Sequence, residues 1–137
     1  MSDCIFCKIV KGEMPSEKVY EDDNVIAFMD ISPANKGHTL IIPKEHYETI
    51  LELPQDLMQK VAACSKKVAQ GVVESTGAEG FNLLVNNKKI AGQLVDHVHF
   101  HIIPRFENDG IDMTFPHKKY GETEIGEYAQ KIKEKID

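Results

Sequence analysis

Three histidines alternate with apolar residues in one short segment of this 137-residue chain, at positions 97–103. In an extended strand, side chains alternate between the two faces with a period of two. His97, His99 and His101 would therefore share one face, while the apolar residues between them would face a core. The pattern predicts a strand that presents a row of imidazoles.

Such a row suits two kinds of chemistry. A neutral imidazole is a good nucleophile towards phosphorus, and a protonated neighbour can assist a leaving group. Imidazole also binds metals, with a zinc–nitrogen distance of about 2 Å. On a regular strand His97 and His101 lie about 13 Å apart, so at most an adjacent pair holds one ion. At least one of the three histidines would then not be a metal ligand and could take part in catalysis.

A second motif, Cys4-x-x-Cys7, allows either zinc binding or thiol redox chemistry. Redox motifs of this type usually follow a strand and open a helix, and only three residues precede Cys4, so redox chemistry is disfavoured. A closed zinc site needs two further ligands, which His46 and His97 could supply. The third cysteine, Cys64, falls in an apolar helical stripe and is expected to be a small buried hydrophobe.

The remaining sequence predicts the elements that position these residues. The order is a hairpin (19–21 and 25–29), a strand (39–42), a long helix (54–76), a strand (81–85), a polar connection (86–96), the histidine strand (97–103) and an amphipathic helix (125–136). One long helix between consecutive strands predicts an α+β domain on a mainly antiparallel sheet. Glycine-rich nucleotide motifs of the G-x-G-x-x-G or Walker type are absent from the sequence.

Composition narrows the class of protein. The net charge is −6 and no Lys/Arg run exceeds two residues, so a nucleic-acid partner is not expected. The longest apolar run is 25–29, far short of the roughly 20 residues of a membrane-spanning helix. The segment 1–4 has neither a basic start nor an apolar stretch, so we expect no secretory signal. A cytoplasmic protein is the simplest interpretation.

The histidine segment and several shorter motifs of the sequence resemble those of a known family. His97-Val98-His99-Phe100-His101-Ile102-Ile103 matches the H-φ-H-φ-H-φ-φ signature of the histidine triad (HIT) nucleotide-binding proteins. Further landmarks occur in order at 4–7, 27–33, 37–44 and 92–93. The resemblance covers about residues 3–105 and is greatest to the bacterial branch with an extended C-terminus.

The resemblance implies a fold and an assembly. The family has a small α+β subunit with a mainly antiparallel five-stranded sheet, one long helix and, in this branch, a C-terminal helix. Residues 1–105 would form the HIT domain, and 106–137 an extension that packs on the domain or on a dimer partner. Family members are usually homodimers whose two sheets join.

The resemblance also implies catalytic roles. His99 would be the nucleophile that attacks the α-phosphorus of a purine nucleotide and forms a nucleotidyl-imidazole intermediate. The carbonyl of His97 would hold its other ring nitrogen. His101 would contact the phosphate or the leaving group, and His38 would support the cluster.

Three further residues would bind the nucleotide by resemblance. Asp30 corresponds to the acceptor of the ribose hydroxyls, and Asn86 and Gln93 correspond to polar residues of the phosphate pocket. Leu94 departs from the pattern, because well-known eukaryotic members carry a serine beside the phosphate. A leucine cannot donate that hydrogen bond, which affects the expected choice of leaving group.

Family members that carry the N-terminal C-x-x-C motif bind zinc, so the resemblance also implies a zinc site in this chain. The ligands implied here are Cys4, Cys7, His46 and His97. The ion would be structural: it would support the start of the histidine strand and leave His99 free.

The expected function is that of a nucleotide hydrolase or transferase acting on purine nucleoside phosphoramidates or related conjugates through a covalent histidine. One alternative is cleavage of dinucleoside polyphosphates, a chemistry of a sister branch that Pro104-Arg105 faintly resembles. Another is a zinc-stabilised nucleotide-binding module with vestigial catalysis. Thiol redox chemistry through Cys4 and Cys7 ranks last.

Overall fold

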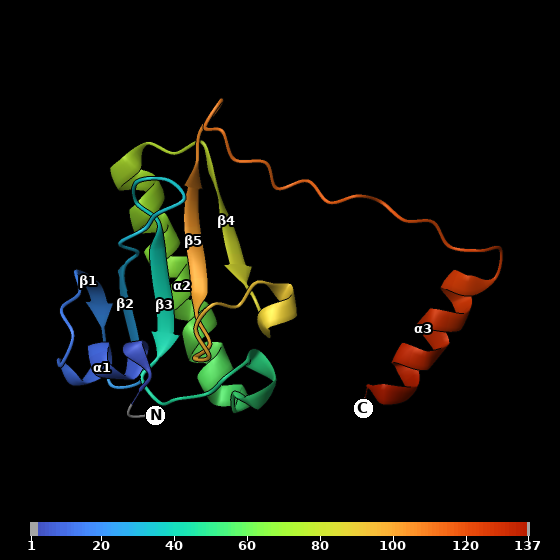
Figure 1. Cartoon of the computed structure of the whole chain (residues 1–137), viewed down its shortest axis with the longest axis horizontal. Coiled ribbons are helices and arrows are strands. Elements are labelled where there is room, and N and C mark those ends of the chain that lie inside the picture. Colours follow the sequence, from blue (N-terminus) through green and yellow to red (C-terminus); the bar gives the residue numbers. More distant parts are fainter. Residues whose placement is uncertain (1–2, 137) are drawn as a thin grey trace.

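A five-stranded antiparallel sheet with strand order β1-β2-β3-β5-β4 forms the centre of the domain (Figure 1). The computed structural model describes residues 3–136. The elements are α1 (Ile5–Lys11), β1 (Lys18–Glu21), β2 (Val25–Met29), β3 (Thr39–Pro43), α2 (Gln55–Thr76), β4 (Gly80–Val85), β5 (Phe100–Arg105) and α3 (Glu124–Lys135). Short 3-10 turns occupy Ile50–Glu52 and Lys89–Ala91. The predicted α+β class and element order are confirmed.

Both faces of the central strands are covered, which explains why β2 and β3 are almost wholly apolar. Val25, Ala27 and Ile41 belong to the core cluster that packs on α2. The alternate residues of the same strands, such as Ile26 and Phe28, belong to a second cluster that packs on α1. α2 therefore covers one face of the sheet and α1 covers part of the other. The uncovered remainder of the α1 face leaves room for a cavity.

The long helix α2 agrees with its predicted bounds. Pro54 precedes its first residue, and Gly77 follows its last with φ of 71°, a left-handed conformation that glycine adopts without steric cost. The predicted apolar stripe is buried along its length, including Cys64. Burial raises the pKa of the Cys64 thiol to about 11, so this cysteine is a core residue.

The predicted strand over 97–103 is wrong at its start, because β5 begins only at Phe100. Beyond the last ladder pair, Ile41 with Phe100, β3 ends at Pro43, which has no N–H to donate. The backbone N–H of Val98 donates instead to the carbonyl of Tyr47 at 2.8 Å. The alternation of faces nevertheless continues beyond the ladder, since Val98 packs in the α2 core with Phe100.

Helix α1 was not predicted from the sequence. Its cap is Cys4, whose Sγ accepts a hydrogen bond from the N–H of Cys7 at 3.4 Å, and cysteine is not one of the usual N-capping residues. The helix ends at Gly12, with φ of 79°. It places Phe6 and Ile9 on the sheet and both cysteines of the C-x-x-C motif beside His97.

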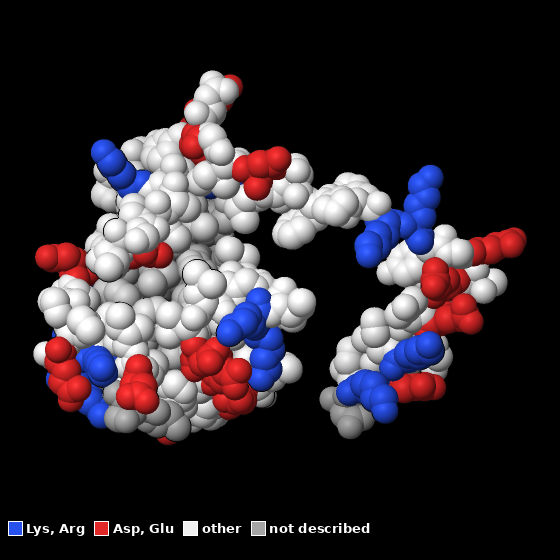
Figure 2. Space-filling view, viewed as in Figure 1, with Lys and Arg blue, Asp and Glu red and all other residues white. Residues whose placement is uncertain are grey.

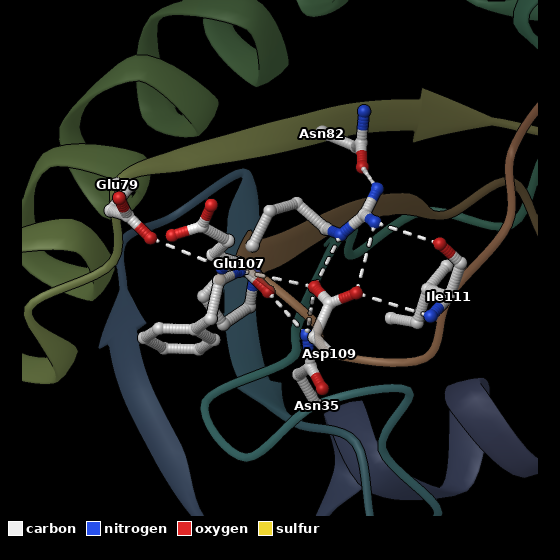
Figure 3. A network of polar contacts seen from close by, with 9 residues as sticks. Asn35, Glu79, Asn82, Glu107, Asp109 and Ile111 are labelled. Atoms are coloured by element: carbon white, nitrogen blue, oxygen red, sulfur yellow. Dashed lines mark hydrogen bonds and ion pairs between the residues drawn. The ribbon is translucent and has the colours of Figure 1, made fainter.

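A polar network fixes the turn that follows β5 (Figure 3). The side chain of Asp109 is 6% exposed and accepts hydrogen bonds from Arg105 Nε at 2.8 Å and from Asn35 Nδ2 at 3.0 Å. The side-chain amide of Asn35 also donates to the carbonyl of Pro104 at 2.8 Å. The backbone carbonyl of Asn35 accepts a hydrogen bond from the N–H of His38. The network therefore joins the end of β5 to the loop that carries His38.

The C-terminal extension leaves the domain after this network. Residues 112–122 form neither helix nor strand, apart from a turn just before α3, and α3 stands away from the domain (Figure 1). The predicted amphipathic helix is confirmed, but none of its described residues is buried. Ile125, Tyr128 and Ile132 are 60%, 49% and 55% exposed. Its apolar face therefore has no cover within the described part of this chain.

Charged side chains of both signs are mixed on the surface. Figure 2 shows acidic and basic residues interspersed over one face of the domain and along α3. Among the helices of residues 3–136, none combines the length and apolar character required to cross a membrane.

Candidate functional site

A cavity of about 560 Å³ lies between α1, β2, β3 and the loop before β5, within the size range of small-ligand pockets. Apolar side chains form most of its wall, among them Ile5, Phe6, Ile9, Phe28, Leu40 and Val95. His99, His101, Asp30 and Asn86 add polar groups to the lining, and the rings of His99 and His101 lie with their centroids 4.9 Å apart. Such a cavity can hold a flat apolar ring and present hydrogen-bonding groups to a polar substituent.

The hydrogen bond of His99 fixes which ring nitrogen is free. Nδ1 lies 2.8 Å from the carbonyl oxygen of His97, and because a carbonyl only accepts, Nδ1 carries the proton. The lone pair of neutral His99 is therefore on Nε2. Burial lowers the pKa of His99, which keeps the ring uncharged at neutral pH. His99 thus has the protonation state of a nucleophile.

A chain of hydrogen bonds assigns the proton of His101 in the same way. The backbone N–H of Ala34 donates to His38 Nδ1 at 3.0 Å, so neutral His38 carries its proton on Nε2. His38 Nε2 lies 2.9 Å from His101 Nδ1 and donates to it. The proton of His101 is then on Nε2, which is buried and has no protein partner among the described residues. This N–H is available to a ligand oxygen or nitrogen.

Asp30 completes this cluster. Its Oδ2 lies 3.6 Å from His38 Nε2, and its Oδ1 accepts from the N–H of Ser32 at 2.8 Å. Asp30, His38 and His101 could also be considered as metal ligands. Two nitrogens bound to one zinc ion would be about 3.3 Å apart, however, whereas those of His38 and His101 are at 2.9 Å. The geometry is that of a direct hydrogen bond.

These imidazoles make the folded state sensitive to acid. Burial, with the neighbouring His99 and His38, lowers the pKa of His101 from 6.5 to about 4. The unfolded chain then binds more protons than the folded chain between about pH 6.5 and 4, so stability falls as the pH is lowered through that window. We expect Tm to be roughly 5 °C lower at pH 5 than at pH 7.

Two histidine variants test whether His101 causes this pH dependence of stability. A His101→Gln protein should lose part of the pH dependence, whereas His117→Gln, at an exposed position, should keep it. Calorimetry over this pH range makes the comparison. Equal slopes for the wild type and His101→Gln would contradict the assignment.

Four ligand atoms form a second cluster beside the cavity. The donor atoms of Cys4, Cys7, His46 and His97 all lie within 4.8 Å of one another. The Sγ–Nδ1 distances are 3.4 Å for Cys4 and His97, 3.6 Å for Cys7 and His97, and 3.4 Å for Cys7 and His46. The sulfur–nitrogen edge of a tetrahedral zinc site is about 3.5 Å. The four residues predicted from the sequence therefore fit a tetrahedral ion.

The tautomer of His97 is consistent with this use. His97 Nε2 donates to the carbonyl of Pro43 at 2.9 Å, which leaves the lone pair on Nδ1, the atom that faces both sulfurs. Burial lowers the pKa of His97 to about 4 and keeps the ring neutral, as metal ligation requires. A hydrogen bond from a ligand histidine to a backbone carbonyl is common around metals.

The cysteines are poorly suited to redox chemistry. The C-x-x-C motif does open a helix, which the sequence analysis did not expect. Burial and the neighbouring Cys4 nevertheless raise the pKa of Cys7 above the usual thiol value, which lowers its reactivity when no ion is bound.

The three predicted residues of the loop before β5, Asn86, Gln93 and Leu94, lie in different environments. Asn86 lines the cavity, and Leu94 stands at its rim with 90% of its surface exposed. Gln93 is fully buried: its Oε1 accepts from the N–H of Lys88 at 2.7 Å and its Nε2 donates to the carbonyl of Glu48 at 2.6 Å. Gln93 therefore shapes the loop, and its predicted contact with a phosphate stays a prediction.

Phe6 is a site residue that the sequence analysis missed. Its ring meets the ring of His99 edge to face, with centroids 5.0 Å apart, and that of His97 at 5.8 Å. Its position between the two cysteines of the Cys4-x-x-Cys7 motif was the available signal.

Comparisons with known proteins agree with this site. The HIT domain family model matches residues 11–108. The chain is 43% identical over 134 residues to the adenosine 5′-monophosphoramidase of Schizosaccharomyces pombe, which covers 97% of this chain and 98% of that protein. A crystal structure from Streptococcus mutans has a TM-score of 0.95 at 46% identity and covers 100% of this chain and 87% of its own. A Zn-bound histidine triad family protein from Mycobacterium smegmatis has a TM-score of 0.77 at 36% identity, with coverage of 82% and 81%.

Proposed function

The chain belongs to the HIT domain family, and from this premise we propose that it hydrolyses purine nucleoside phosphoramidates, or transfers their nucleotidyl group, at the α-phosphorus. The observation that carries the proposal is the free Nε2 of a neutral His99 in the lining of the cavity. The monophosphoramidase name of the S. pombe relative supports the choice of substrate class.

In the first step, Nε2 of His99 attacks the α-phosphorus and the P–N bond of the substrate breaks. The bonding electron pair leaves with the amine, which needs a proton. His101 donates that proton from Nε2, and His38 Nε2–H, hydrogen-bonded to His101 Nδ1, can replace it. This transfer leaves His38 one proton short until the water of the second step returns a proton to the cluster.

In the second step, water attacks the phosphorus of the nucleotidyl-His99 intermediate. The P–N bond to His99 breaks, the nucleoside monophosphate leaves, and the proton from water returns to the histidine cluster. The carbonyl of His97 holds His99 throughout and stabilises its positive charge in the intermediate. Asp30 accepts from the ribose hydroxyls, and Asn86 contacts the phosphate from the loop side.

We propose zinc as the ion at Cys4, Cys7, His46 and His97, supported by the sulfur–nitrogen distances and by the Zn-bound relative. The ion supplies structural cross-linking and takes no part in the chemistry at phosphorus. Cys4, Cys7 and Cys64 form no disulfide, which suits the reducing cytoplasm, where we place the activity.

We further propose a homodimer in which the extension packs on the partner subunit. β4 is an edge strand with Phe81 and Leu83 half exposed, and the uncovered α3 lies beyond it (Figure 1). A TM-score of 0.95 over the whole chain indicates that the S. mutans protein holds its extension in the same place. A second copy against β4 would cover both apolar surfaces.

Charge substitutions on α3 test this assembly. Ile132→Glu, on the apolar face, should shift the protein towards monomers at micromolar concentration in analytical ultracentrifugation. Gln130→Glu adds the same charge to the same helix and should leave the dimer intact. Dissociation by both variants, or by neither, would contradict the proposed packing.

Quenched-turnover mass spectrometry tests the chemistry. With an adenosine phosphoramidate we expect a transient adenylyl adduct on His99 and release of AMP. A dinucleoside polyphosphate serves as the comparison substrate, because cleavage of such compounds is the alternative function that Pro104-Arg105 suggested. Arg105 is hydrogen-bonded to Asp109 and Asn82, so its guanidinium is not free to bind a phosphate. Tight AMP binding without an adduct would favour a nucleotide-binding module without catalysis.

A further inference from the structure

Helix α1 contributes to both the metal cluster and the cavity. Cys4, which caps it, and Cys7 direct their sulfurs towards the histidines of the cluster. Ile5, Phe6 and Ile9 of the same helix line the cavity. The two sites thus share one short element, with ligands and wall residues interleaved along it.

This helix has little stability of its own. It contains seven residues, and isolated helices shorter than about 12 residues are marginal in water. Its order therefore depends on the packing of Phe6 and Ile9 against the sheet and on whatever fixes its N-terminal turn. An ion held by Cys4 and Cys7 would tie that turn to His46 and His97, which lie on other segments.

The ring of Phe6 contacts residues of both sites. Its ring packs edge to face on the metal-cluster residue His97 (5.8 Å, 76°) and on the nucleophile His99 (5.0 Å, 79°). It also packs on Phe28 across the cavity wall, at 5.6 Å. A shift of α1 would move this ring, and with it both the wall of the cavity and the contact that orients His99.

We propose that α1 couples the metal cluster to nucleotide binding, with Phe6 as the positioning residue that links them. The inference rests on the proposed function, since the ligand of the cavity is taken to be a purine nucleotide. Coupling of this kind is reciprocal: an ion that orders α1 raises nucleotide affinity, and a bound nucleotide raises ion affinity by the same factor. Metal supply would then set how much nucleotide the protein binds.

The test measures binding and does not depend on turnover. Calorimetric titration with AMP should give a dissociation constant about fivefold or more weaker for chelator-treated protein than for zinc-loaded protein. In the reverse direction, AMP should slow the transfer of zinc from the loaded protein to a chromogenic chelator several-fold. This second measurement starts from the folded, loaded protein, so it stands even where the depleted protein unfolds.

Two phenylalanine variants separate coupling from general packing. Phe6→Leu keeps an apolar cavity wall but removes the contacts with both histidine rings, and should reduce the effect of AMP on zinc transfer to the part that the His97–His99 hydrogen bond carries. Phe106→Leu removes a half-buried ring that lines neither the cavity nor the metal cluster, and should keep the effect.

The outcomes distinguish this inference from the function on which it rests. Equal AMP affinity with and without zinc, together with AMP-independent zinc transfer, would overturn the coupling while leaving the proposed function standing. An equal loss of the effect in Phe6→Leu and Phe106→Leu would overturn the assignment of Phe6. Loaded protein that neither binds AMP nor forms an adduct would instead overturn the function itself.

Discussion

Replacing His99 by alanine should reduce turnover of an adenosine phosphoramidate by about ten-thousandfold or more, because the variant has no nucleophile to form the covalent intermediate. His101 cannot substitute, since its Nδ1 is occupied by His38 and its Nε2 carries a proton. The adenylyl adduct should disappear from the quenched reaction. Mass spectrometry and steady-state kinetics on the same preparation make the measurement.

The control for this variant is His117→Ala, at an exposed position in the extension. Circular dichroism should show both variants folded, and AMP should still bind to His99→Ala, because the wall of the cavity remains. Added free imidazole should restore part of the activity by occupying the space of the deleted ring. Wild-type rates in His99→Ala would exclude the covalent mechanism.

Much of this site could be predicted from local pattern. The period-two alternation of His97, His99 and His101 indicated a shared face, and the structure retains that alternation even outside the β5 ladder. The bounds of α2 followed from Pro54, Gly77 and an apolar stripe at helical spacing. Such signals lie within a few residues of one another, so they survive without tertiary information.

The features that were not predicted depend on distant partners. The start of β5 is set by Pro43 and Tyr47, which lie more than forty residues earlier in the sequence. α1 is too short to show helical periodicity, and its cap is a cysteine placed by the histidines of the metal cluster. The engagement of Gln93 with the Glu48 carbonyl is likewise a contact between loops that no local pattern encodes.

The tautomers show how the fold adds chemistry that the sequence cannot. Residue types alone offer several interchangeable imidazoles. Backbone groups that can only accept (the carbonyls of His97 and Pro43) or only donate (the N–H of Ala34) assign one proton position to each ring. His97 thereby faces the sulfurs with a lone pair, His99 faces the cavity with a lone pair, and His101 keeps a proton to donate.

Replacing Cys7 by alanine should remove the ion and lower the free energy of unfolding by about 3 to 5 kcal/mol, because a structural zinc site binds only the folded chain. The matched control is Cys64→Ala, which truncates another buried thiol far from the cluster and should cost about 1 kcal/mol. Metal analysis should find about one zinc per chain in the wild type and in Cys64→Ala, and none in Cys7→Ala.

Chelator sensitivity separates loss of the ion from loss of packing. A strong chelator should lower the Tm of the wild type and of Cys64→Ala to near that of Cys7→Ala, while leaving the Tm of Cys7→Ala unchanged. If Cys7→Ala kept its zinc, or if the chelator lowered all three Tm values equally, the four-residue site would be wrong. An ion at this site would hold His97 in place, and the carbonyl of His97 holds the ring of His99. Loss of the ion should therefore reduce activity even in the fraction of Cys7→Ala that remains folded.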